Sequence, residues 1–435
     1  MSELNTPYLS GTCELATIVI AQLTISLLTE QSALCDSHSS RSLASFSSIP
    51  VNWQRRTIRY LRTEIASKSK SLAPKTVDAI AKLKTKPTEV QLVKECGPEA
   101  LAEVVKWEGI TSLFLKSEKF ENRDALKPMP SLVELKIDLK KSKEKPIDLG
   151  PVGKLTNLES LDCNSTKVTN TAALKGCSKL KKIVLFDSDV DSIEFLNSTP
   201  NVEQLAIGGS RHTFPDYQPV TSLKKLKILS IVGNQQANDE TLAVLKSIST
   251  IEEMQMNGCN KVTTLDSLSG STGLKELIAG GQTLEDASVL EKMKDLEMIR
   301  MGHPNLNDLS IFKGKTKLTV VTLLGCKAES LAGLEDSKQL TKLDVRNSTT
   351  VSDISALEGM SELYTLNLSN TAVTDLSVLK SMKKPGWLDI SDTKVSDLSP
   401  LADHPRLYNL TCRNSGVNDI SVLPSIEGIT SFKNI

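Results

Sequence analysis

The residue types that usually carry out chemistry are scattered along this 435-residue sequence. Its eight cysteines form no Cys-x-x-Cys pair and have no zinc-type spacing to a histidine. The cysteines are Cys13, Cys35, Cys96, Cys163, Cys177, Cys259, Cys326 and Cys412, and the isolated histidines are His38, His212, His303 and His404. The sequence also lacks a glycine-rich phosphate loop, a Gly-x-Ser-x-Gly motif and a His-Glu-x-x-His motif. We therefore expect no catalytic residues, no metal site and no cofactor.

Four aspartates recur at a regular spacing. Asp353, Asp375, Asp397 and Asp419 are 22 residues apart, and each stands two residues before a serine. A calcium ion needs more oxygen ligands than one carboxylate per repeat supplies. Aspartate does, however, accept hydrogen bonds from backbone N–H groups two or three residues later. The row therefore predicts a series of capped turns and not a cation site.

The aspartates belong to a longer repeat whose most regular part is the pattern L-x-x-L-x-L. Instances of this pattern start at Ile110, Leu132, Leu158, Leu180, Val202, Leu226, Ile251, Leu274, Leu296, Leu318, Leu340, Leu363, Pro385 and Leu407, with a terminal echo at Ile429. The starts lie 22 to 26 residues apart. Helical repeats are longer, at about 33 residues or more. Positions within a unit are counted below from these starts.

A second motif follows the first at a fixed distance, in forms such as VSDISAL at 351–357 and VTDLSVL at 373–379. Together the two motifs resemble the internalin-type, 22-residue leucine-rich-repeat family over residues 110–435. The resemblance implies an α/β solenoid of about fourteen units, a leucine-rich-repeat horseshoe with a parallel concave β-sheet and short 3-10 or irregular convex turns. It also implies recognition, since proteins with such repeats include adhesins, invasion proteins, phosphatase regulators and scaffolds.

The physics of one unit supports the same architecture. The alternation in L-x-L predicts a short strand with leucines inward and their neighbours outward, and each unit can bury its apolar side chains only against adjacent units. The ninth position is usually a small residue that we expect to be buried and hydrogen-bonded where the strand ends. It holds Thr166, Ser188, Asn234, Cys259, Cys326, Ser348, Thr371, Thr393 and Ser415.

Four cysteines have a structural explanation within this repeat. Cys259 and Cys326 occupy the ninth position, and Cys163 and Cys412 replace the inward leucine at the sixth. Small buried thiols need no disulfide framework. Reduced cysteines favour an intracellular location, with a secreted or surface protein as the alternative.

The N-terminal part has a different composition. Residues 1–50 are rich in serine and predict a flexible leader, although the apolar run at 15–28 leaves a cleaved signal segment as the alternative. Residues 51–109 predict a helical N-terminal cap, with helices within 51–86. The many Lys and Arg residues of the 55–86 helical region indicate a solvated face of this cap; contact with an acidic membrane is the alternative.

Two insertions lengthen the repeat. The first, at 138–150, is basic, and the second, at 210–223, carries Phe214 and Tyr217. Insertions in solenoids leave as loops and are common places for added binding. We expect Phe214 and Tyr217 to contact a partner, unless the second insertion is only tolerated length.

The outward positions three, five and seven of each strand predict a binding face. Those in the middle units are apolar apart from one arginine, and those toward the C-terminus are polar, charged or aromatic. The candidate contact residues are Ile278, Met298, Arg300, Val320, Leu324, Lys342, Asp344, Arg346, Trp387, Asp389 and Arg413. Aromatic and arginine side chains beside an apolar patch have the composition of interface hot spots.

The charge composition is consistent with this interpretation. Lys plus Arg equals Asp plus Glu at 52 each, so no net field attracts nucleic acid. We expect a monomer that binds a protein partner on the concave face. The alternatives are a regulatory subunit that docks on an enzyme such as a phosphatase, and a host-directed effector or surface adhesin of a bacterium or parasite. An enzyme with its active site in residues 1–109 is the least favoured alternative.

Overall fold

The computed structural model describes residues 88–93, 98–116, 129–139 and 146–423, except 211, 213, 215, 281–282, 303–304, 383, 403 and 405. The chain divides into two compact units, residues 1–139 and 140–435. The expected leader, the helices within 51–86 with their membrane alternative, and the echo at Ile429 lie outside the described residues. The same holds for Cys13, Cys35 and Cys96.

The described part of the first unit contains three parallel strands. These are β1 (Glu89–Val93), β2 (Ser112–Lys116) and β3 (Glu134–Ile137), and β2 pairs with both of the others. Helix α4 (Pro98–Val104) lies between β1 and β2 in the chain, with proline at its first residue, where no N–H is needed. The sequence places 88–109 in the helical cap, but β1 shows that parallel strands begin before residue 110. Buried Val90 and Leu92 alternate with outward residues in β1, but the sequence around them does not contain the full L-x-x-L-x-L pattern.

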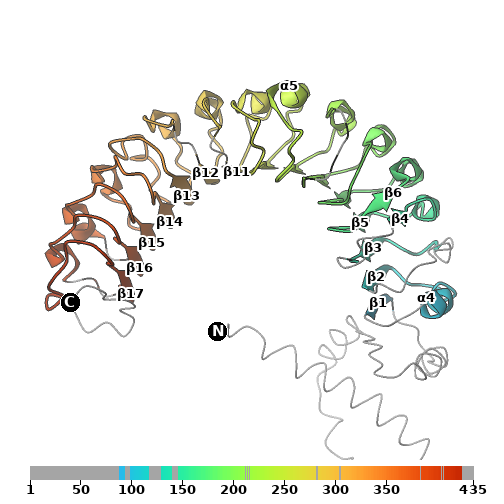
Figure 1. Ribbon diagram of the computed structural model, residues 1–435, viewed down its shortest axis with the longest axis horizontal. Helices are drawn as coiled ribbons and strands as arrows, with labels where there is room; N and C mark the ends of the chain where they lie inside the picture. The colour runs from blue at the N-terminus through green and yellow to red at the C-terminus, as the bar shows by residue number, and fades with distance from the viewer. Residues whose placement is uncertain are drawn as a thin grey trace, which may run out of the picture. The chain divides into compact units, whose positions relative to one another are not determined.

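The described part of the second unit contains twelve parallel strands in one sheet, each hydrogen-bonded to the next in chain order. They are β5 (Ser160–Asp162), β7 (Lys182–Val184), β8 (Gln204–Ala206), β9 (Ile228–Ser230), β10 (Glu253–Gln255), β11 (Glu276–Gly280), β12 (Met298–Gly302), β13 (Val320–Leu324), β14 (Lys342–Asp344), β15 (Thr365–Asn367), β16 (Trp387–Asp389) and β17 (Asn409–Thr411). Within this unit the strands follow the inner side of an arc and the helical turns follow its outer side (Figure 1). The parallel concave sheet expected from the repeat is therefore present.

Short 3-10 turns form the outer side of the second unit. They are η3 (Val152–Lys154), η4 (Thr171–Gly176), η5 (Glu194–Ser198), η6 (Gln218–Ser222), η7 (Ala243–Ser247), η8 (Asp266–Leu268), η9 (Ser288–Lys292), η10 (Ser310–Phe312), η11 (Ser355–Leu357), η12 (Ser377–Ser381) and η13 (Ser399–Leu401). One α-helical turn, α5 (Asp239–Leu242), precedes η7. A two-stranded parallel pair, β4 (Ile147–Asp148) with β6 (Val168–Thr169), lies outside the main sheet.

The recurring aspartates start these turns, as expected. The backbone N–H of Ser377 donates to Asp375 at 2.7 Å, and that of Ser399 donates to Asp397 at 2.8 Å. Asp353 and Asp419 accept the same bond from the serine two residues later. These bonds hold the pKa of Asp353, Asp397 and Asp419 below the usual value, because they stabilise the carboxylate.

Leucine, isoleucine and valine of neighbouring units form the continuous core. In the unit that begins at Leu340, the inward side chains Leu340, Leu343 and Val345 are all 0% exposed. The predicted inward cysteines Cys163 and Cys412 are buried as well, and the described cysteines are free thiols. At the ninth position Ser188 is fully buried and donates to the carbonyl of Cys163, in the preceding unit, at 2.8 Å.

Buried polar side chains lie three residues before some of the unit starts, where the sequence shows no regular pattern. Ser271 donates to the carbonyl of Ile248 at 2.7 Å, and Ser337 donates to that of Lys315 at 3.0 Å. Lys315 is itself 0% exposed; its Nζ donates to the carbonyls of Leu290 and Met293 at 2.6 and 2.9 Å. Each such bond joins one unit to the preceding unit on the outer side of the array. These side chains thus satisfy backbone carbonyls at the ends of the turns.

The second insertion folds into the core of the array. Phe214 is 3% exposed and Tyr217 is 1% exposed, and their rings meet edge to face with centroids 5.3 Å apart. The prediction that these two side chains contact a partner is therefore wrong. Aromatic rings are large and apolar, and here the extra chain length fills the interior instead of leaving it.

Neutral His212 holds this insertion to the neighbouring unit. Its Nδ1 accepts the N–H of Val190 at 3.1 Å, which leaves the proton on Nε2 to donate to the carbonyl of Gly208 at 2.6 Å. Burial lowers the pKa of His212 below its usual value, because the charged ring would lose its hydration. The imidazole therefore serves as a neutral bridge between two backbone groups.

Candidate binding face

The strands turn three side chains per unit toward the inner side of the arc, at positions three, five and seven. Among the predicted contact residues, Arg300, Arg346 and Arg413 are exposed. Those that are half-buried are Ile278, Met298, Val320, Leu324, Lys342, Trp387 and Asp389. Only Asp344 is buried, at 6% exposed. Alternation along a strand therefore places all of these residues except Asp344 on an accessible face.

The register brings the apolar candidates of the middle units together. Met298 pairs with Val320, and Arg300 stands between Ile278 and Thr322 on the adjacent strands. Leu324 pairs with Gly302, which has no side chain to cover it. The result is a small apolar patch on β11, β12 and β13 with one exposed guanidinium beside it.

Acidic side chains border this patch, and the sequence analysis did not identify them. Glu253 and Glu276 are direct cross-strand partners on β10 and β11, an arrangement in which like charges repel. Burial first, and then the charges of Glu253 and Glu297, raise the pKa of Glu276, while Arg300 opposes them. Identical charges at position three of consecutive units were the available sequence signal.

Several polar side chains of the C-terminal strands accept hydrogen bonds from backbone N–H groups of their own unit. Asp344 accepts the N–H of Arg346 at 3.3 Å and lies 3.7 Å from its Nε, which explains its burial. Asp389 accepts the N–H of Ser391 at 2.9 Å, and Asn367 accepts that of Ser369 at the same distance. These hydrogen bonds lie where each strand ends. The exposed arginines and Trp387 are therefore the main side chains on this part of the face that are available to contact a partner.

A second apolar group lies on β7 to β9. Val184, Phe186, Ile228 and Val232 occupy outward positions and are half-buried. Gly208 lies in the row between Phe186 and Val232, and a Cβ there would come 2.4 Å from the carbonyl oxygen of Val232. The same offsets that identified the middle patch would have found these residues.

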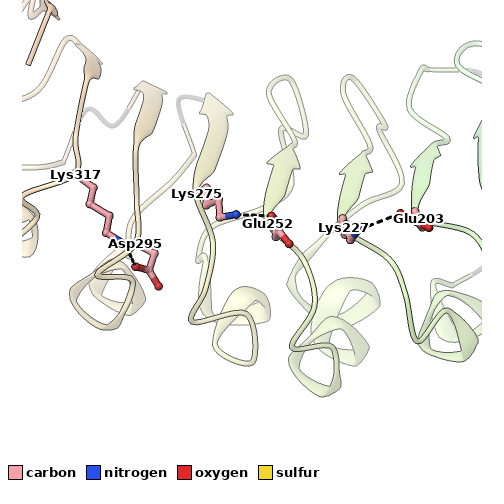
Figure 2. A network of polar contacts seen from close by, with 6 residues as sticks. All are labelled: Glu203, Lys227, Glu252, Lys275, Asp295 and Lys317. Carbon is pink, nitrogen blue, oxygen red and sulfur yellow. Dashed lines mark hydrogen bonds and ion pairs between the residues drawn. The ribbon is translucent and has the colours of Figure 1, made fainter.

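A row of alternating charges follows the edge where the strands begin, at position two of successive units. Glu159, Lys181, Glu203, Lys227, Glu252, Lys275 and Glu297 form this charged rim. The Nζ of Lys227 lies 3.0 Å from Glu203, and that of Lys275 lies 2.7 Å from Glu252, so each pair joins adjacent strands (Figure 2). The alternation is visible in the sequence at position two, outside the outward positions three, five and seven.

Hydrogen bonding within the rim perturbs its titration. The bond with Glu252 raises the pKa of Lys275, and the same bond lowers the pKa of Glu252. A neighbouring pair one residue earlier in the unit, Lys317 with Asp295 at 2.6 Å, lowers the pKa of Asp295 in the same way (Figure 2). These charges are exposed, and such pairs contribute little to stability individually.

Comparisons with known proteins agree with this geometry. An internalin, InlF of Listeria monocytogenes, superimposes with a TM-score of 0.57 at 18% identity, covering 77% of this chain and 88% of that one. A leucine-rich-repeat protein of Leptospira interrogans gives 0.53 at 15% identity, covering 77% and 83%. The functional domain of InlJ from Listeria monocytogenes gives 0.52 at 17% identity, covering 80% and 74%. The chain has a leucine-rich-repeat fold.

At these sequence identities the structural similarity shows that this chain shares the leucine-rich-repeat fold. It does not show which partner the protein binds. No protein-family model matches its sequence, and no curated protein matches it. The 22-residue period and its resemblance to internalin-type repeats are thus confirmed at the level of architecture. The choice of contact residues stays a prediction.

In the described ranges, no group of three or more His, Cys, Asp or Glu side chains could hold a metal ion. No helix within those ranges is long and apolar enough to cross a membrane. A hollow of about 430 Å³ opens at the charged rim, but Glu203, Lys227, Glu252 and Lys275 in its lining already form ion pairs with one another.

Proposed function

We propose that this leucine-rich-repeat protein binds a protein partner on the inner face of β11 to β17 and catalyses no reaction itself. The observation that carries the proposal is one continuous row of strands that joins the apolar patch around Arg300 to half-buried Trp387 and to exposed Arg346 and Arg413. Arginine and tryptophan are enriched among residues that dominate binding energy. The half-buried apolar side chains around them exclude water from the contact when a partner binds.

Partner capture with matched variants tests this proposal. Trp387→Ala and Arg346→Glu should each weaken capture of the same partner, by about 30-fold if the residue is a hot spot. Lys394→Glu changes an exposed charge outside the face and is the control. Equal retention of the same proteins by wild type and both face variants would show that binding does not use this surface.

The same experiment distinguishes a simple recognition protein from an enzyme regulator. A captured partner with phosphatase activity that changes on binding would favour the regulator. A partner without enzymatic activity would favour recognition alone. In both cases the contact surface is the same, so the variants apply unchanged.

A further inference from the structure

Two exposed tyrosines meet over a glycine at the C-terminal end of the strand edge. Tyr364 is 43% exposed and Tyr408 is 49% exposed. They occupy position two of the units on either side of Gly386, and their ring centroids are 6.1 Å apart. Tyr408 raises the pKa of Tyr364, chiefly through a side-chain hydrogen bond.

Gly386 makes this contact possible. A Cβ at this position would lie 2.5 Å from Cε2 of Tyr364 and 2.9 Å from Cε1 of Tyr408. The glycine therefore leaves room for side chains from two non-adjacent strands to cover one backbone segment. Trp387 follows it, in register between Thr365 and Asn409. We call Tyr364, Trp387 and Tyr408 the aromatic shelf.

The charges around the aromatic shelf are predominantly positive. Lys342, Arg406 and Arg413 surround it on β14, before β17 and after β17, and in the described part of the chain none of them has an ion-pair partner. Two carboxylates, Asp344 and Asp389, lie on the same strands and keep their charge, and Asp344 faces Arg346 at 3.7 Å. Asp389 accepts a backbone N–H, and Glu362 pairs with Lys384.

We propose that the aromatic shelf binds an acidic, extended segment of the protein partner that carries an aromatic side chain. The inference rests on the proposed function and specifies which chemistry its C-terminal half recognises. The two tyrosine rings pack over Gly386, so they can stack on an aromatic ring of the partner with little loss of their own conformational freedom. Three unpaired cations at the border attract carboxylates and repel a basic segment.

Defined copolymers test the proposal with the full-length protein. A fluorescent glutamate–tyrosine copolymer should bind at least about tenfold more tightly than polyglutamate, which cannot stack. A lysine–tyrosine copolymer should show no binding, because it keeps the ring but reverses the charge. Fluorescence anisotropy at low salt measures all three.

A pair of glycine variants isolates the aromatic shelf. Gly386→Ala should displace both tyrosine rings and weaken binding of the glutamate–tyrosine copolymer about tenfold, although every aromatic residue remains. Gly273→Ala is the matched control, because a Cβ there meets nothing within 4 Å. Neither glycine has a positive φ, so alanine introduces no backbone strain. Thermal unfolding of both variants verifies that they are folded.

Several results would overturn the inference. Equal binding of the glutamate–tyrosine copolymer by wild type and Gly386→Ala would exclude the shelf, as would equal binding of the lysine–tyrosine copolymer. Binding of a soluble glycan in place of the acidic copolymer would assign the shelf to another ligand class. Capture that still depends on Arg346 but shows no copolymer binding would leave the proposed function standing and reject only this inference.

Discussion

At many positions of the repeat, the residue type is determined by the local backbone conformation and by the backbone hydrogen bonds that the side chain makes. Position eight illustrates this, because Asn347, Asn370, Asp392 and Asn414 all adopt positive φ values where the strand turns outward. Other units place a glycine there, such as Gly233 and Gly325. Asn, Asp and Gly tolerate this left-handed region better than other residues. The recurring residue type therefore reflects backbone geometry and not a ligand.

Buried Lys315 gives a pH-dependent prediction at this scale. Burial lowers its pKa from the usual 10.5 to about 8. Below pH 8 the lysine is charged in both folded and unfolded chains; between pH 8 and 10.5 only the unfolded chain keeps the proton. The free energy of unfolding should therefore rise by up to about 3 kcal/mol across that interval.

Urea unfolding of wild type and Lys315→Met at several pH values measures this contribution. The difference between the two proteins should depend on pH only above about pH 8. Lys313→Met, which removes an exposed lysine nearby, should behave as wild type does. A constant difference from pH 7 to 10.5 would contradict a depressed pKa at Lys315.

At the scale of elements, each strand and turn is short and depends on its neighbour. The 3-10 turns contain three to six residues, too few to persist alone. Each capping aspartate fixes the start of its own turn. Buried side chains such as Ser188 and Ser271 bond a carbonyl of the preceding unit and so join neighbouring units. The charged rim adds ion pairs between the first residues of adjacent strands. Because its charges alternate, each strand start has an oppositely charged neighbour.

Charge reversal tests the rim. Lys227→Glu should lower the melting temperature more than Lys227→Gln does, because the reversal places Glu203, residue 227 and Glu252 in an unbroken acidic row. The difference between the two variants should disappear near 1 M NaCl, where the Debye length is about 3 Å. A difference that persisted at high salt would indicate lost packing and not electrostatics.

For the second unit as a whole, stability is a sum over neighbours. In the part of this unit that the structure describes, each strand of the main sheet pairs only with the strands on either side of it. The inner face is available for binding because the side chains of each strand alternate, and because one layer of core suffices to hold it. A local defect should therefore weaken adjacent units first.

A core substitution tests this description. Leu343→Ala in β14 should destabilise the protein by about 3 kcal/mol. Hydrogen exchange should accelerate most in β13, β14 and β15 and least in β5 and β7. Lys342→Ala, the half-buried outward residue beside it, is the control. Uniform acceleration along the whole sheet would show that the array unfolds as one cooperative body.

The sequence alone predicted burial or exposure correctly at the positions that follow the repeat period. Leu340, Leu343 and Val345 could be placed in the core because inward positions in a parallel stack must be apolar. The capping aspartates and the outward position of Trp387 followed from the same spacing. The binding face was thus largely predictable as a set of accessible positions, with Asp344 as the exception.

Only the tertiary structure decided the features that depend on contacts between units. Phe214 and Tyr217 are buried, although their insertion breaks the period, because the space they fill is set by neighbouring units. Lys315 stands at an inward position because two carbonyls of the preceding turn need donors. The meeting of Tyr364 and Tyr408 over Gly386 is likewise a relation between different strands. A linear repeat specifies which way a side chain faces, but the stacking of successive coils determines what it meets there.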